Sequence, residues 1–149
     1  SLYVFRRRTL MDPVLASFDA PTGEVSCVKR DRSNTPLAAL ATLNETIFSE
    51  AARALAVRVL REGQGDDRQR LKFAWRLCTA RDPQANEVDR LEQFLAQQRR
   101  RLVNGEISAR EIAPAGVVES GDAPATIDAA VWTMVARVLL NLDETLTKG

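Results

Sequence analysis

The chain has 149 residues, of which 45% are hydrophobic, and its 21 basic and 20 acidic side chains give a net charge of +1. A chain of this size and composition can bury a core as one globular domain, which excludes a disordered chain and a disulfide-stabilised miniprotein. A chain with a net charge this close to zero also does not have the excess of basic residues that forms the binding face of a nucleic-acid-binding protein. We therefore expect no nucleic-acid partner.

The first 33 residues predict an extended, irregular arm. Leu2–Phe5 has the composition of a short strand, and the segments Asp12-Pro13 and Asp19-Ala20-Pro21 are turn formers that forbid a long helix. At most one helical turn is expected, over 14–18. A single short strand is not stable alone, so it must pair with a preceding part of the protein or lie across the helices that follow.

Residues 34–149 have helical periodicity and form the body of the predicted domain. Helices are expected over 36–43, 45–62, 66 or 67 to about 80, 85–103 and 127–142, with at most a short turn after Ser108 and a loop over 113–125. The fold class is therefore mainly α, a bundle of four to five helices behind the arm. Residues 34–62 have the widest apolar arcs, so we expect them at the centre of the fold.

The most apolar stretch of the chain does not suit a membrane span. It covers residues 129–142, only 14 residues, and contains Arg137. A span needs about 20 predominantly apolar residues. We expect a buried helix here and no membrane span.

The chain contains no histidine and two cysteines, Cys27 and Cys78. Without histidine there is no Ser/His or Cys/His nucleophile pair, and without a C-x-x-C pair there is no zinc site and no covalent c-type haem site in this chain. Cys78, on an apolar helix face, is expected to be a small buried hydrophobe. Cys27 lies beside Lys29 and Arg30, whose positive charges would lower the pKa of its thiol and make it reactive. The alternative is a thiol without a chemical role. We expect both cysteines to stay free.

Polar residues of the arm and the first helix form a candidate polar cluster, in which we expect Arg30 to pair with Asp19. Arginines of the arm could instead hold phosphate or sulfate groups. The members of the candidate polar cluster are Asp19, Cys27, Arg30, Asn34 and Asn44.

Several short motifs occur in order along the chain: Phe18-Asp19-Ala20-Pro21, Ser26-Cys27 with Arg30, Asn34-Thr35-Pro36-Leu37-Ala38-Ala39-Leu40 with Leu43-Asn44, Ala51-Ala52-Arg53-Ala54-Leu55-Ala56, Arg81-Asp82-Pro83 with Glu87, and Trp132 followed by Leu139-Leu140-Asn141-Leu142-Asp143-Glu144. Together these motifs resemble the C-terminal half of a domain of unknown function, the 1553 family of such domains, which is abundant in planctomycetes.

The resemblance implies a multidomain, exported protein in the periplasm or at the cell surface. It places a c-type cytochrome module, and hence the haem, elsewhere in the full-length protein, and it makes the preceding domains of the same polypeptide the expected partners. Two functions remain open. The chain is a helical structural and interaction module, or it is part of an enzyme that acts on an extracellular polysaccharide, sulfated or unsulfated, and whose site is completed by preceding residues. The residues do not decide whether it is an enzyme.

Overall fold

The computed structural model describes residues 11–21, 24, 26–29 and 35–146. These residues form nine helices and no strand, so the mainly α class is confirmed. The strand expected over Leu2–Phe5 lies outside the described residues. The helices are α1 (Pro13–Ser17), α2 (Pro36–Asn44), α3 (Thr46–Glu62), α4 (Asp67–Thr79), α5 (Ala85–Val103), α6 (Ala109–Ile112), α7 (Ala115–Glu119), α8 (Ala123–Leu140) and α9 (Asp143–Leu146).

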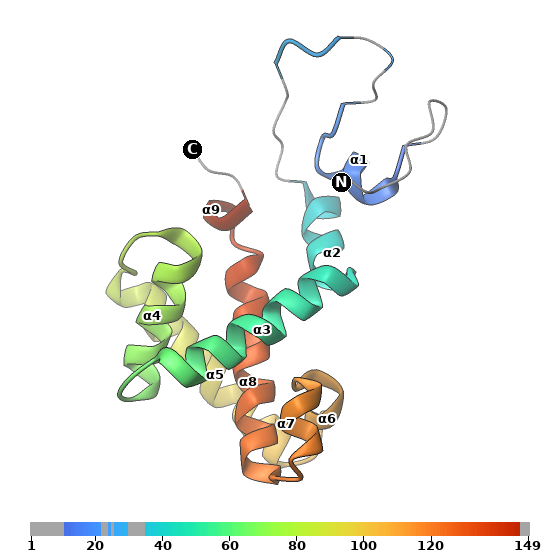
Figure 1. The fold of residues 1–149 in the computed structure, drawn as a ribbon. Coiled ribbons are helices and arrows are strands. Elements are labelled where there is room, and N and C mark those ends of the chain that lie inside the picture. The colour runs from blue at the N-terminus through green and yellow to red at the C-terminus, as the bar shows by residue number, and fades with distance from the viewer. Residues whose placement is uncertain (1–10, 22–23, 25, 30–34, 147–149) are drawn as a thin grey trace.

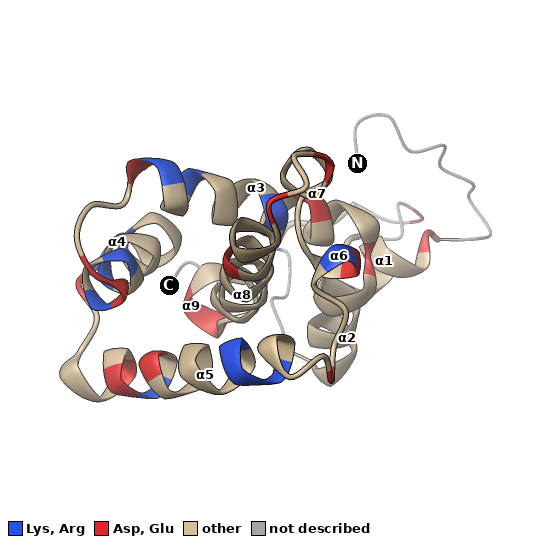
Figure 2. Ribbon diagram, turned by 90° about the horizontal axis from the view of Figure 1, so that it is seen from below, with Lys and Arg blue, Asp and Glu red and all other residues tan. Residues whose placement is uncertain are grey.

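Helix α8 is the centre of the fold. It lies between α3 on one side and α5 on the other, with α4 beside it (Figures 1 and 2). Half of its residues are buried, including Trp132 and Leu139. A helix that is apolar on all sides is stable in water only when neighbours cover it, and α8 is contacted over its length by α3, α4, α5, α6, α7 and α9. With 18 residues, α8 is longer than the 14-residue apolar stretch on which the sequence analysis judged a membrane span too short. Its length and composition would suffice to cross a membrane, but a mostly buried core helix passes the same test, and half of α8 is buried inside the fold.

The expectation that residues 34–62 form the centre was wrong in part. Helix α3 does pack closely on α8, through Ala52, Ala56 and Val59, which are fully buried. Helix α2, however, lies at the edge of the body and contacts mainly α1 and α3 (Figure 1). A helix with a wide apolar face has the same sequence pattern whether other helices of the chain cover that face or leave it exposed. The width of the apolar face of α2 therefore could not predict its position in the fold.

Capping residues set the helix starts close to where the sequence placed them. The Thr35 hydroxyl accepts a hydrogen bond from the Ala38 N–H at 3.1 Å, with Pro36 in the first turn of α2. Asp66 caps α4 in the same way, by accepting from the Gln69 N–H at 2.8 Å. These caps satisfy backbone donors that have no partner within the helix.

The loop expected over 113–125 is partly helical. It contains α7 and the first turn of α8, which begins four residues before the predicted start at residue 127. Pro124 lies in that first turn, and the Asp122 carboxylate accepts a hydrogen bond from the Ala125 N–H at 3.2 Å. Proline lacks an N–H, but a first-turn N–H has no helical partner, so here it begins a helix instead of interrupting one.

Candidate interaction site

Large aliphatic side chains lie exposed on α2 and on the first turn of α3. Leu37, Leu40 and Ile47 are 62%, 55% and 69% exposed, and Leu43 is exposed as well. We call these four residues the apolar face. Residues 37–44 carry no charged side chain. Exposed aliphatic residues gathered on consecutive helices are typical of a surface that another protein segment covers.

The opposite side of α2 is fixed to the body. Ala38 and Thr42 are buried there, and Thr42 Oγ1 lies 2.6 Å from Asn141 Oδ1, at the end of α8. The Arg137 guanidinium, also on α8, donates a hydrogen bond to the Leu43 carbonyl near the end of α2. Helix α2 is therefore held on one side by polar contacts and presents the apolar face on the other.

The structure describes three members of the candidate polar cluster. Asp19 follows α1 with a left-handed backbone (φ 53°), and Cys27 and Asn44 are exposed. The Cys27 thiol donates to the Lys29 carbonyl at 3.2 Å, and the Asn44 amide donates to the Leu40 carbonyl at 2.8 Å. These two side chains thus bond within their own segments. Arg30 and Asn34 lie outside the described residues, so the Asp19–Arg30 pair stays a prediction.

An ion-pair cluster that the sequence analysis did not anticipate joins α4, α5 and α9. The Arg81 guanidinium donates to both oxygens of Glu87, at 2.7 and 2.9 Å, and to both oxygens of Glu144, at 2.7 and 2.8 Å. It also lies 5.0 Å from the centre of the Trp75 ring. Hydrogen bonds from Arg81 hold the pKa of both carboxyl groups below its ordinary value. All five guanidinium donors face carboxylates or the Asp82 carbonyl, so the cluster is structural.

A second arginine fixes α5 between its neighbours. Arg99 donates to Asp67 on α4 and to Asp128 on α8, at 2.7 Å in each case. All three side chains are about one-third exposed, so water still screens the pairs. As in the cluster around Arg81, the charged groups of this bridge pair with one another inside the fold and are not available to a ligand.

The two thiols and the possible metal ligands are the remaining groups of the described residues that could take part in chemistry. Cys27 and Cys78 are free, as predicted. Cys78 is partly buried against the core and not fully buried as expected. Desolvation raises the pKa of Cys78 to about 11, so its thiol is protonated and unreactive at neutral pH. In the part of the chain that the structure describes, no three side chains of the metal-ligating kinds come together. The apolar face is thus the surface feature that most needs a functional explanation.

Comparison with known proteins identifies a family but no activity. Residues 1–95 match the model of the PSD1 family, whose description is "protein of unknown function (DUF1553)". This match covers α1 to α4 and the first half of α5, and so includes the whole apolar face. No curated protein and no solved structure matches the chain.

Proposed function

The chain belongs to the DUF1553 family of proteins of unknown function, and on this premise we propose that it is a helical structural and interaction module of a larger exported protein. Its partner is the preceding part of the same polypeptide, and the apolar face is the surface on which that part docks. Export, and a c-type cytochrome module that carries haem elsewhere in the protein, are the parts of the proposal that rest on the resemblance alone.

The exposure of the apolar face is the observation that carries the proposal. Fully burying one leucine or isoleucine side chain contributes roughly 1.5–3 kcal/mol. Leu37, Leu40 and Ile47 are each more than half exposed, so most of this contribution remains available to a partner. The lack of charge over 37–44 also removes the desolvation cost that a buried ionic side chain would add.

The position of the apolar face in the sequence favours a partner that belongs to the same polypeptide. The apolar face belongs to the first helices of the body and lies within the segment that the family model matches. A segment of the same polypeptide meets the face at a high effective concentration, so even a small apolar contact suffices to hold it. A separate protein would need a larger interface to bind as firmly, because it also loses translational and rotational freedom.

Amide hydrogen exchange tests the docking. We would compare this chain alone with the polypeptide that also carries its preceding sequence. Docking should slow the exchange of the α2 amides at least tenfold in the longer polypeptide and leave the α5 amides unchanged. Equal exchange of α2 in the two polypeptides would contradict the proposal.

Matched variants make this test specific to the apolar face. Leu37→Lys together with Leu40→Lys, in the longer polypeptide, should abolish the extra protection of α2. Val103→Lys is the control, since Val103 is 65% exposed at the end of α5 and lies outside the apolar face. If the control removed the protection equally, the docking surface would lie elsewhere.

Cell fractionation tests the export that the resemblance implies. An antibody against this chain should detect the full-length protein in the periplasmic or surface fraction, together with covalently bound haem. Recovery from the cytoplasm alone would refute this part of the proposal and leave the docking surface untouched.

A further inference from the structure

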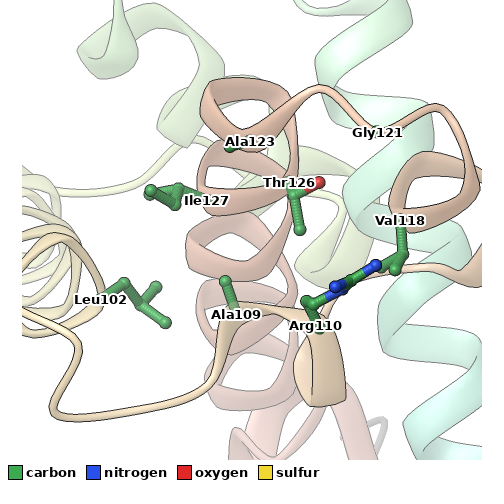
Figure 3. A pocket seen from close by; sticks show the side chains of 8 residues that line it. All are labelled: Leu102, Ala109, Arg110, Val118, Gly121, Ala123, Thr126 and Ile127. Atoms are coloured by element: carbon green, nitrogen blue, oxygen red, sulfur yellow. The ribbon is translucent and has the colours of Figure 1, made fainter.

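A small open pocket lies at the end of the fold away from the apolar face. It is bounded by the end of α5, by α6 and α7, and by the first turns of α8 (Figure 3). Its volume is about 280 Å³, or roughly nine times the share of one water molecule in the liquid. This is just below the range of pockets that hold drug-sized ligands, so the pocket suits a smaller molecule.

Aliphatic side chains make most of the pocket wall. Leu102 from α5, Val118 from α7 and Ile127 from α8 line it, with Ala109 and Ala123 between them. Leu102 is buried and the other two large side chains are partly buried against the core, so the wall is fixed by the packing of three helices. Such a surface suits a short hydrocarbon chain better than a sugar ring, because Arg110 and Thr126 are the lining residues with polar side chains and the Thr126 hydroxyl already donates to the Asp122 carbonyl.

One cationic side chain completes the pocket. Arg110 of α6 extends along it, toward Val118 and below Thr126 (Figure 3). Most arginines of the body are engaged, for example Arg81 and Arg99 with carboxylates. Arg110 is exposed, and it takes part in none of the ion pairs that the described residues form. Its donors are therefore available to an anion that enters the pocket.

We propose that this pocket binds a small aliphatic monocarboxylic acid. The carboxylate pairs with Arg110, and the hydrocarbon chain lies on Leu102, Val118 and Ile127. This inference is independent of the proposed docking function, because the pocket shares no residue with the apolar face.

The charges around the pocket favour a single negative charge over a phosphate. Residues 104–128 contain five acidic side chains and Arg110 as the one basic side chain. Two of the five are paired with arginines of α5, and the Asp122 carboxylate caps α8. Glu111 and Glu119 remain close in sequence to the pocket lining, so a second negative charge on the ligand would be repelled without a second cation to balance it.

A titration of the whole chain with hexanoate, followed by two-dimensional NMR of the backbone amides, tests the proposal. Amides lining the pocket, such as those of Gly121 and Thr126, should shift and saturate with a Kd of about 1 mM, the affinity expected of a ligand with fewer than ten heavy atoms. Hexanol has no negative charge, and hexyl phosphate has more negative charge than hexanoate. Each should bind at least tenfold more weakly than hexanoate. Equal binding of hexanol would refute the role of Arg110.

Three variants separate the pocket from general effects of charge. Arg110→Gln should weaken hexanoate binding at least tenfold, whereas Arg90→Gln, which removes an exposed arginine of α5, should not change it. Val118→Trp should fill the pocket and abolish binding while Arg110 is still present. Unchanged binding in both Arg110→Gln and Val118→Trp, or no saturable shift in the natural chain, would overturn the inference.

Discussion

Three leucines with different exposure allow the packing of the fold to be tested by one substitution, leucine to alanine. Leu139 on α8 is fully buried in the core, Leu55 on α3 is partly buried against it, and Leu40 on α2 is 55% exposed. Removing three carbon atoms from a fully buried leucine costs about 3–5 kcal/mol, because a cavity adds to the lost transfer free energy. The free energy of unfolding should therefore fall in the order of burial.

The expected losses follow from these environments. Leu139→Ala should lower the free energy of unfolding by about 4 kcal/mol, a large part of the roughly 5–15 kcal/mol that a domain possesses. Leu55→Ala should cost about half as much, since part of the side chain already meets water. Leu40→Ala should cost less than about 1 kcal/mol.

Urea unfolding, followed by the circular dichroism of the helices, measures the free energy of unfolding of all three variants. An unchanged dependence of that free energy on urea concentration would show that each variant exposes the same surface on unfolding. In a thermal scan, the loss for Leu139→Ala corresponds to a melting temperature lower by about 10 °C. A loss for Leu40→Ala as large as that for Leu139→Ala would mean that α2, and not α8, lies at the centre. The assignment of the core would then be wrong.

Three further predictions concern charge and thiol chemistry. A double-mutant cycle of Arg99→Met and Asp128→Ala, measured by urea unfolding, should give a coupling of about 0.5–1 kcal/mol, and additive losses would show that the bridge between α5 and α8 is not formed. The hydrogen bond from Arg81 lowers the pKa of Glu87 from its ordinary value of 4.5. The negative charge of Glu87 therefore stabilises the fold above pH 4.5, and this stabilisation is lost progressively as the pH falls below that value. The stability lost in Glu87→Gln should thus be constant near neutral pH and shrink on acidification, whereas a loss independent of pH would exclude the ion pair as its cause. At pH 8 an alkylating reagent should modify exposed Cys27 well before Cys78, whose pKa is about 11; mass spectrometry showing equal rates would contradict the burial of Cys78.

Local signals made most helices predictable. Thr35 followed by Pro36 marks a helix start through the chemistry of two adjacent residues, and Asp66 does the same for α4. The loop expected over 113–125 includes Pro124, which begins α8. Proline both ends and begins helices, and the capping contact of Asp122 distinguishes the two cases. Such a contact depends on the backbone already being helical.

Long-range relations could not be predicted in the same way. Arg81 and Glu144 are 63 residues apart and meet only because α9 returns toward the end of α4. Arg81 and Glu87 lie within the residues that the family model matches, whereas Glu144 lies beyond them, so the family gave no reason to join the three. The apolar character of α2 was visible in the sequence, yet whether it faces the core or a partner depends on where the other helices end.

The central position of α8 has a consequence for synthesis on the ribosome. Helices α3, α4 and α5 emerge first, but the helix against which α3 and α5 pack is the last long one in the chain. At about 5–20 residues per second, the apolar surfaces of α3 and α5 stay uncovered for seconds until α8 follows. The nascent chain therefore exposes the apolar surfaces of α3 and α5 during this interval, and a chain truncated before Ala123 would lack the helix that covers them.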